Sequence, residues 1–338
     1  MEKAEKTAFP RAGSVDYAGM YRRVSEYLNN DVHSEVNMGA RIIDGGLLTD
    51  HGPEHIRTVI QRASELVFTK SCRLSPYEIY ILLMAIHFHD VGNIKGREDH
   101  EIKSGEIYKE LGRLASIDAT ERHYIVNIAQ AHGGRQKDKL ELLEKTFGKA
   151  PKLLGFTVRV PLLASILKLA DELADEYTRA TKIDWAVVPK ESQVFHKFAY
   201  ALKTVDINHE THTVELDFWL DKENATTKYG KLDSEIFLVD EIKERTYKTH
   251  LERLYCMRFM ADEIRLNSVV VKINFLEPDS IDPFHDPIGY RLEEKGYPGH
   301  DIAGSAPDPY TEFARLCPDT PFSGESIRDE VIALDGDL

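Results

Sequence analysis

Residues 81–104 read ILLMAIHFHDVGNIKGREDHEIKS, an apolar run that ends in His89-Asp90 and is followed by a further histidine, His100. The run continues a segment that begins at Ser75-Pro76, where proline takes a first-turn position of a helix. Because the segment is apolar on nearly all sides, we expect a helix at the centre of a bundle. Buried imidazole and carboxylate groups are costly unless they are paired or bind a metal. The stretch therefore predicts partners elsewhere in the chain.

The composition is that of a globular protein. With 338 residues, 42% of them hydrophobic, the chain can bury a substantial core. The N-terminal MEKAEKTAFPRAG lacks the apolar segment of a signal peptide, and no apolar stretch approaches the roughly 20 residues that span a bilayer. We expect a cytoplasmic location and no membrane partner. The three cysteines, Cys72, Cys256 and Cys317, are far apart, which argues against a disulfide framework and a thiolate zinc site.

The net charge of −14 is concentrated at the C-terminal end. There, 15 acidic and 4 basic residues follow residue 276, which leaves 39 Lys and Arg against 42 Asp and Glu in residues 1–276. The main body is therefore nearly neutral and lacks the broad basic stripe of a duplex-binding protein. We expect a small phosphorylated substrate and no extended duplex binding.

Helical periodicity dominates the first half of the chain. Apolar residues follow Gly52-Pro53 at helical spacing, and the pattern predicts further helices over residues 98–113, 118–132 and 161–179. From about residue 193 the pattern changes. Two strand-like runs within 194–220 flank a polar turn, residues 267–276 alternate like a third strand, and residues 233–265 between them resemble one long amphipathic helix. We predict a mainly α fold, a helical bundle with a small antiparallel β addition.

The predicted organisation is one domain over residues 14–276, with the site in 51–179 and the β addition and long helix in 193–276. Residues 277–338 form an acidic, proline-rich C-terminal extension that holds 8 of the 14 prolines, and we expect an irregular or partly disordered arm there. A solubilising role is the simplest interpretation. The alternative is a partner-binding or autoinhibitory segment. The apolar faces of the β addition and long helix are also compatible with a homo-oligomer interface.

Four further segments place polar side chains at helix edges or inside apolar helices. His55 follows Gly52-Pro53, His132 stands before two glycines, and the others are His100 in REDHEIKSG and Asp171 in LLASILKLADELAD. Together with His89 and Asp90 they are enough for two divalent cations, and the sequence does not choose among Mn, Fe, Co, Ni, Mg and Zn. Because a carboxylate can bridge two ions where a single imidazole cannot, Asp90 is the predicted bridge.

The order His, His-Asp, His, His, Asp, with HDVG ending an apolar helix and LADELAD after it, resembles the HD-domain superfamily of metal-dependent phosphohydrolases over about residues 51–179. The short gap from Asp90 to His100 and the AHGG segment are similar to dinuclear members, such as dinucleoside-polyphosphate hydrolases and the HD nuclease domains of CRISPR effectors. The LADELADEYTR segment and the β addition resemble an HD branch found in bacterial conflict systems, which implies a role in bacterial defence.

The resemblance implies hydrolysis of a phosphate ester or anhydride of a nucleotide, or of a short nucleic-acid end, by a metal-activated hydroxide. It implies that Asp90 bridges two ions, that His55, His89 and Asp171 hold one of them, and that His100 and His132 hold the other. The implied catalytic residues are Asp90 and Lys103. The implied substrate-binding residues are Lys95, Arg97, Lys103 and Arg135, and the implied supporting residues around the ligands are His51, Asp175 and Arg179.

The sequence also departs from the superfamily pattern. Asn93 stands where the commoner HDIGK form has lysine, so either Lys95 or Arg97 supplies that cation or the substrate needs none. AHGGRQ lacks the paired histidines and GYP segment of cyclic-di-GMP phosphodiesterases, which argues against that activity. Two alternatives stay open. One is a deoxynucleoside triphosphate triphosphohydrolase with a single metal, in which His100 or His132 acts on the substrate. The other is a non-catalytic HD module that senses a nucleotide and signals through the C-terminal extension.

Two other histidines lie beside the predicted ligands. His51 competes with His55 for the first position of the pattern. His87 is two residues from His89, or about 200° around a helix, so we expect it to point away and to be packed or hydrogen-bonded.

Overall fold

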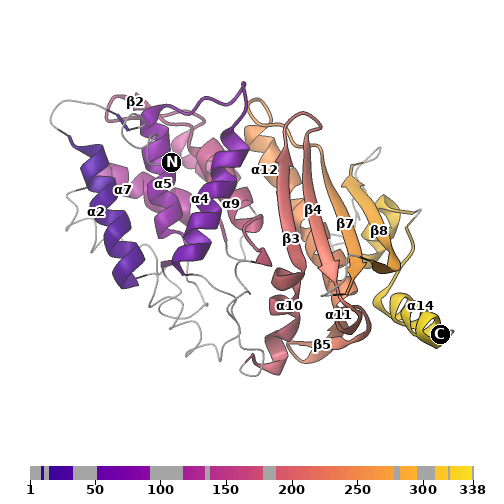
Figure 1. Ribbon diagram of the computed structural model, residues 1–338. Coiled ribbons are helices and arrows are strands. Elements are labelled where there is room, and N and C mark those ends of the chain that lie inside the picture. The colour runs from indigo at the N-terminus through magenta and orange to yellow at the C-terminus, as the bar shows by residue number, and fades with distance from the viewer. Residues whose placement is uncertain are drawn as a thin grey trace. The chain divides into compact units, whose positions relative to one another are not determined.

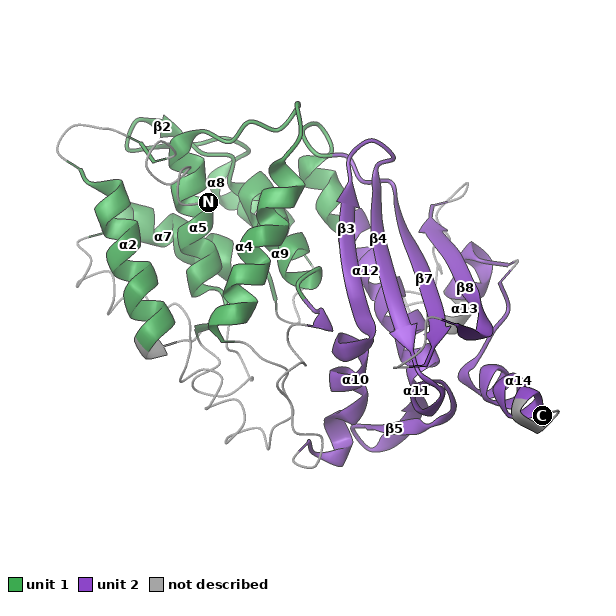
Figure 2. Ribbon diagram, in the orientation of Figure 1, with its two compact units in different colours: residues 1–174, 255–264 green, residues 175–254, 265–338 purple. Residues whose placement is uncertain are grey.

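The computed structural model describes residues 9–10, 15–32, 52–91, 117–133, 138–177, 188–277, 282–294, 309–318 and 320–336. The chain forms two compact units, which Figure 2 colours separately. Unit 1 comprises residues 1–174 and 255–264, and unit 2 comprises residues 175–254 and 265–338. The chain therefore leaves unit 1, builds a large part of unit 2, and returns to unit 1 before it completes unit 2.

Unit 1 is a helical bundle (Figure 1). Its central helix is α5 (Pro76–Phe88), which contacts α2, α4, α7 and α9 and is buried on nearly all sides, as the sequence predicted. The other elements are α2 (Tyr17–Tyr27) with a π-helical turn (Leu28–Val32), α4 (Pro53–Val67), α7 (Ala119–Gln130), α8 (Lys139–Phe147), the hairpin of β1 (Lys152–Leu153) and β2 (Phe156–Thr157), α9 (Val160–Glu172), and the last residues of α12 (Leu238–Met260).

Local signals set the ends of these helices. The Ser75 hydroxyl accepts a hydrogen bond from the Glu78 N–H (3.2 Å), and the Glu78 carboxylate accepts one from the Ser75 N–H (2.9 Å), so a capping box starts α5. Asp118 caps α7 and confirms the start of the helix predicted over 118–132. The helix predicted over 161–179 ends earlier, because the Ala174 N–H bonds to the Asp171 carbonyl and closes a turn. The helix predicted over 98–113 lies outside the described residues.

Unit 2 contains a four-stranded sheet of order β3-β4-β7-β8. Neighbouring strands are antiparallel except β4 and β7, which are parallel. The predicted small antiparallel addition is therefore wrong in size and in type, since the sheet is larger and mixed. The long connection through α12 explains the difference, because a crossover of this length lets a strand enter in the same direction as its neighbour. The strands are β3 (Leu202–Asn208), β4 (Thr213–Leu220), β7 (Ser268–Leu276) and β8 (Pro283–Glu293).

Two further predictions for unit 2 are corrected. The two strand-like runs predicted within residues 194–220 are present as β3 and β4, but the stretch begins as a helix, α10 (Gln193–Ala201), which buries Val194 and Phe198 at helical spacing. The irregular arm predicted beyond residue 276 instead contains β8, α13 (Pro309–Leu316) and α14 (Gly324–Gly336), and the Gly324 N–H donates to the Asp240 carboxylate (3.0 Å). The remaining elements are a 3₁₀ turn (Lys190–Ser192), α11 (Lys222–Thr226), and the hairpin of β5 (Lys228–Lys231) and β6 (Ser234–Phe237).

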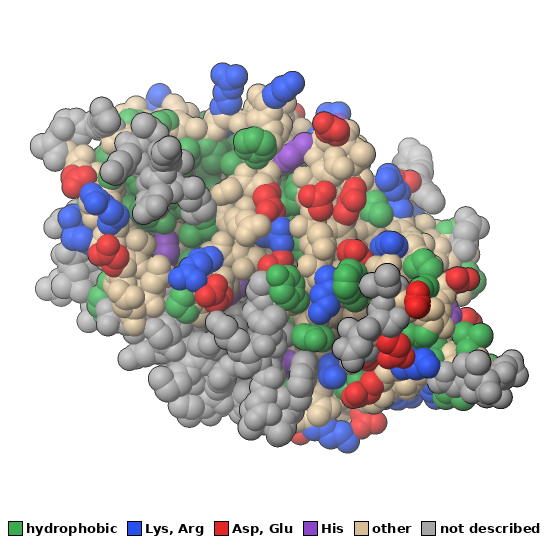
Figure 3. All heavy atoms as spheres, in the orientation of Figure 1, with side chains coloured by type: hydrophobic (Ala, Val, Ile, Leu, Met, Phe, Trp, Pro, Cys, Tyr) green, Lys and Arg blue, Asp and Glu red, His purple; other side chains and the backbone are tan. Residues whose placement is uncertain are grey.

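The visible surface carries charges of both signs. Figure 3 shows acidic and basic side chains interspersed on the face that it displays, with no broad basic stripe among the coloured residues. Among the described residues, every helix is too short or too polar to cross a membrane.

Candidate metal centre

Three helices of unit 1 bring four of the predicted ligands together. His55 lies in the first turn of α4, His89 and Asp90 follow the end of α5, and Asp171 lies in the last turn of α9. Contacts among α4, α5 and α9 hold these ends at one place, and one ligand atom from each of the four residues lies within 4.8 Å of the others. Residues that are far apart in sequence therefore form one cluster.

The distances within the cluster suit a single ion. Nε2 of His55 lies 3.2 Å from Oδ1 of Asp171 and 3.4 Å from Oδ2 of Asp90. Nε2 of His89 lies 3.3 Å from Oδ2 of Asp90 and 3.5 Å from Oδ1 of Asp171. Ligand atoms about 2.1 Å from one ion are about 3.0 Å apart at octahedral angles and about 3.4 Å apart at tetrahedral angles. The observed separations are therefore close to those between ligands of one metal.

Backbone carbonyls orient two of the imidazoles. Nδ1 of His89 donates to the Ile86 carbonyl (2.7 Å), and Nδ1 of His132 donates to the Ala129 carbonyl (2.5 Å). Because a carbonyl oxygen only accepts, each Nδ1 carries a proton, and Nε2 is the nitrogen left to bind a metal. Nε2 is also the nitrogen that faces the carboxylates in both residues.

Asp90 presents its two oxygens to different histidines. Its Oδ2 faces His55 and His89, while its Oδ1 lies 3.6 Å from Nε2 of His132, which follows α7. A carboxylate that bridges two ions has this arrangement. His100, the other predicted ligand of the second ion, lies outside the described residues.

The electrostatics of the centre also favour a cation. The C-terminal ends of α5, α7 and α9 meet there, and the carbonyl end of a helix carries a partial negative charge. Burial disfavours the charged form of His89, but Asp90 and Asp171 outweigh it and raise the pKa of His89 well above its usual range. Burial would raise the pKa of Asp171, but hydrogen bonds from His55 and His89 lower it well below its usual range. The two carboxylates thus stabilise a positive charge at this buried position, whether on an imidazole or on a bound cation.

The donor set fits a divalent metal. Two buried imidazoles and two carboxylates, His55, His89, Asp90 and Asp171, offer the nitrogen and oxygen ligands that Mn, Fe, Co, Ni and Zn accept. Asp171 is the most exposed of the four, with 27% of its side chain accessible, whereas the two histidine side chains are fully buried. Among the described residues, the centre is therefore reached from the side of Asp171.

The other predicted residues have varied positions. Asp175 lies beyond the end of α9, in unit 2, and its carboxylate pairs with Arg245. His87 is hydrogen-bonded to the Tyr21 hydroxyl (3.2 Å), which confirms that it is engaged away from the ligands. The remaining predicted site residues lie outside the described residues: His51, Lys95, Arg97, His100, Lys103, Arg135 and Arg179.

Two lysines that bond to the turn carrying His132 were not predicted. Lys168 of α9 donates to the carbonyl of His132 (2.9 Å), and Lys139 of α8 donates to the carbonyl of Gln130 (2.9 Å). The sequence holds one signal for Lys168, which is the single charge between Pro161 and Asp171 in an otherwise apolar helix. Lys139 begins α8 in a charged stretch and gives no such signal.

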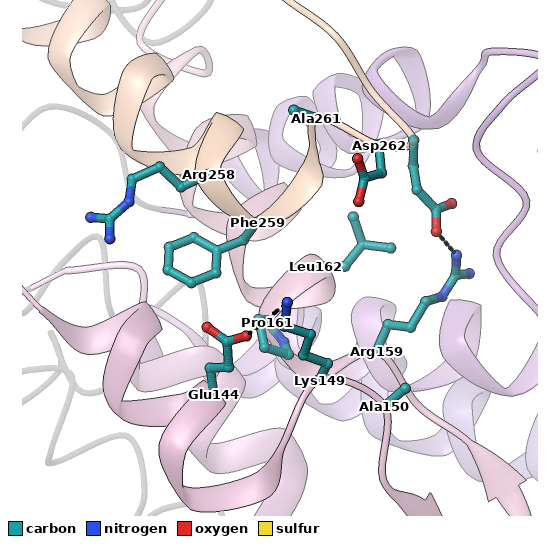
Figure 4. Close-up of a pocket in the computed structure, with 11 residues that line it drawn as sticks. Glu144, Lys149, Ala150, Arg159, Pro161, Leu162, Arg258, Phe259, Ala261 and Asp262 are labelled. Atoms are coloured by element: carbon teal, nitrogen blue, oxygen red, sulfur yellow. Dashed lines mark hydrogen bonds and ion pairs between the residues drawn. The ribbon is translucent and has the colours of Figure 1, made fainter.

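A separate cavity of about 280 Å³ lies at the start of α9 (Figure 4). Its apolar wall includes Leu162 and Phe259, and two ion pairs lie in its lining, Lys149 with Glu144 (3.6 Å) and Arg159 with Glu263. Leu162 and Asp171 are nine positions apart in α9, which corresponds to about 14 Å along the helix. The cavity is therefore distinct from the metal centre, and among the described residues the His/Asp cluster is the better candidate for chemistry.

Comparison with known proteins agrees with the geometry. No curated protein matches the chain closely enough to be counted. The HD-CE family model matches residues 46–246, which is more than half of the chain and includes all four clustered ligands. An HD-type domain with this cluster indicates a metal-dependent hydrolase. The matched span and the buried His/Asp centre within it show that the chain belongs to the HD-CE family.

Proposed function

We propose that the protein is a metal-dependent phosphohydrolase that cleaves a phosphate ester or anhydride of a nucleotide, or of a short nucleic-acid end. The observation that carries this proposal is the position of Asp90. Its carboxylate faces His55 and His89 with one oxygen and His132 with the other. Such an arrangement suits two ions a few ångströms apart, and a pair of ions at that spacing can stabilise both the attacking and the leaving oxygen of an in-line displacement at phosphorus.

The chain's own residues would hold the ions and orient the substrate. His55, His89, Asp90 and Asp171 would hold a divalent ion, which would activate water and neutralise charge on phosphoryl oxygens. The substrate approaches from the side of Asp171, which is the more exposed ligand. Burial lowers the pKa of His132, so its imidazole is neutral and its Nε2 is available as a ligand or a proton acceptor.

A second candidate is a deoxynucleoside triphosphate triphosphohydrolase with a single metal. It is favoured by one observation: the tight cluster comprises His55, His89, Asp90 and Asp171 but not His132. In this case His132 would act on the substrate rather than on a metal. Its Nε2, 3.6 Å from Oδ1 of Asp90, would then be an acceptor or donor beside the metal ligands.

Metal content and hydrolysis measured on the same samples would test the proposal. Wild type, Asp90→Asn and His132→Ala would be purified without chelator, with Asp262→Asn, an exposed carboxylate of unit 1, as the matched control. Metal per chain would be measured by inductively coupled plasma mass spectrometry. Hydrolysis of bis(p-nitrophenyl) phosphate and of a nucleotide panel would be followed with Mn²⁺.

The outcomes separate the candidates. Two metals per chain, reduced to at most one by His132→Ala and nearly lost in Asp90→Asn, with diesterase activity at least about 100-fold lower in Asp90→Asn, support the phosphohydrolase. One metal that survives His132→Ala, with tripolyphosphate released from deoxynucleoside triphosphates, supports the second candidate. A metal-loaded wild type that hydrolyses no phosphate ester or anhydride contradicts both.

A further inference from the structure

The turn that ends α7 is held by lysines from two other helices. The ammonium of Lys168, on α9, donates to the carbonyl of His132 (2.9 Å). The ammonium of Lys139, at the start of α8, donates to the carbonyl of Gln130 (2.9 Å) and also to that of Gly133. These carbonyls belong to the last residue of α7 and the turn after it, and the last carbonyls of a helix have no partner within the helix. Side chains thus supply the hydrogen bonds that the helix itself cannot.

The held turn sets the position of one imidazole at the metal centre. Nδ1 of His132 is bonded to the Ala129 carbonyl in the same turn, so the ring is fixed relative to its own backbone. Where the backbone of His132 lies therefore decides where its Nε2 lies, and that atom is 3.6 Å from Oδ1 of Asp90. A shift of the turn would therefore move Nε2 of His132 relative to Oδ1 of Asp90, the carboxylate oxygen that does not face His55 and His89.

Lys168 is more buried than a surface lysine, and burying its ammonium group costs free energy unless the group is hydrogen-bonded. It is half-buried in a helix whose other residues from Pro161 to Ala170 are buried. It also lies three positions before Asp171, so both residues share one side of α9 and the helix connects the lysine to a metal ligand. Its positive charge neutralises the carbonyl end of α7 beside two carboxylates.

We propose that Lys168 is a positioning residue for the His132 side of the metal centre, and that Lys139 assists it by holding the same turn. The inference rests on the proposed function in one respect, namely that the centre binds a divalent ion. Partners that orient a ligand typically change metal affinity by about 10–100-fold when they are removed. Lys168→Met is therefore expected to lower the affinity for a divalent ion on the His132 side of the centre by about 10–100-fold.

The test is Mn²⁺ binding, measured by isothermal titration calorimetry and electron paramagnetic resonance on the full chain. The variants are Lys168→Met, Lys168→Arg, His132→Ala and the double variant Lys168→Met/His132→Ala. Lys149→Met is the matched control, because that lysine belongs to the same unit and its side chain is 88% exposed. Lys168→Gln replaces Lys168→Met if the latter does not fold.

The double variant distinguishes positioning from general structural support. If Lys168 acts through His132, Lys168→Met and His132→Ala weaken the same Mn²⁺ binding step, and the double variant is no weaker than His132→Ala alone. Lys168→Arg keeps a donor for the carbonyl and restores most of the affinity, and Lys149→Met binds as wild type does.

Three results would overturn the inference. Wild-type affinity in Lys168→Met, with weakened binding in His132→Ala, removes the positioning role and leaves the metal centre intact. Additive losses in the double variant show that Lys168 acts elsewhere. A wild type that binds no Mn²⁺ removes the metal centre itself, and therefore contradicts the proposed function as well.

Discussion

The carboxylate of Glu78, in the first turn of α5, accepts hydrogen bonds from the backbone N–H of Arg159 (3.0 Å) and from its guanidinium (2.8 Å) at the start of α9. Both helices carry metal-centre residues at their other ends, His89 and Asp90 after α5 and Asp171 in α9. The Glu78–Arg159 pair therefore fixes the position of α5 relative to α9. It does so at the ends of the two helices opposite to the metal-centre residues.

Glu78→Gln is expected to lower the free energy of unfolding by about 2 kcal/mol, because the buried guanidinium contact loses its charge while Glu263 still neutralises part of Arg159. Urea denaturation followed by circular dichroism measures this. Glu54→Gln is the matched control, since the Glu54–Arg57 pair (2.7 Å) is exposed and should change stability by less than about 1 kcal/mol. Equal effects of the two substitutions would contradict the role given to Glu78.

The same contact gives a pH dependence. Burial would raise the pKa of Glu78, but the hydrogen bonds from Arg159 and Ser75 outweigh it and lower the pKa. A carboxylate with a lowered folded-state pKa contributes stability above its unfolded pKa of about 4.3, and this contribution is lost as the pH falls through the folded-state value. The stability difference between wild type and Glu78→Gln should therefore be constant near neutral pH and shrink below about pH 4. Denaturation curves at several pH values check this, and a difference that grows in acid would disprove it.

Metal binding should stabilise the folded chain. An ion at 100 times its dissociation constant adds about 2.7 kcal/mol, which corresponds to roughly 5 °C or more in Tm for a domain of this size. Thermal denaturation of chelated protein with and without Mn²⁺ measures the shift. Asp90→Asn should lose most of it, because that carboxylate contacts His55, His89 and His132. An equal shift in Asp90→Asn would place the stabilising ion elsewhere.

Gly324→Ala should weaken the packing of α14 against the rest of unit 2. A Cβ at Gly324 would lie 2.1 Å from Cβ of Phe237, which neither residue can avoid without a backbone shift. We expect a loss of about 1–3 kcal/mol and faster hydrogen exchange in α14. Gly289→Ala is the control, because the nearest atom to its Cβ is 3.9 Å away. Unchanged exchange in Gly324→Ala would show that α14 does not depend on this close approach.

Leu154→Asn should stabilise unit 1. Leu154 has a φ of 49° in the two-residue turn between β1 and β2, and its side chain is exposed. A left-handed backbone is unfavourable for leucine but is well tolerated by asparagine, and Asn-Gly is the preferred pair in such a turn. We expect a gain of about 0.5–1 kcal/mol in urea denaturation. A loss of stability would mean that the leucine side chain makes a contact worth more than the strain.

The helical half of the molecule could be predicted because its signals are local. Ser75, Pro76 and an apolar run specify α5, and a buried His89-Asp90 pair at its end requires partners whatever the tertiary fold. The sheet was harder, because a two-residue alternation does not say which strand lies beside which. β8 was missed since Pro283, Asp286 and Pro287 disguise it, although an edge strand tolerates proline.

Other features depend on contacts that no local pattern records. The aromatic residues of α10 favour a strand by propensity, and packing in unit 2 decides for a helix instead. The lysine at position 168 gains its meaning only when α9 is seen to lie beside the carbonyl of His132. Charge in an apolar helix can be read from the sequence, but its partner cannot.

The return of residues 255–264 to unit 1 has a consequence for protein synthesis. The segment fastens to earlier helices, since the Tyr255 hydroxyl bonds to Glu141 and Arg159 pairs with Glu263. All the helices that carry the metal ligands have left the ribosome well before this segment is made. At about 5–20 residues per second, the roughly 90 residues between Glu172 and Ile264 take about 5–18 s to translate. During that interval the helical bundle of unit 1 lacks residues 255–264. A chaperone that binds the surface left uncovered would have this time in which to act.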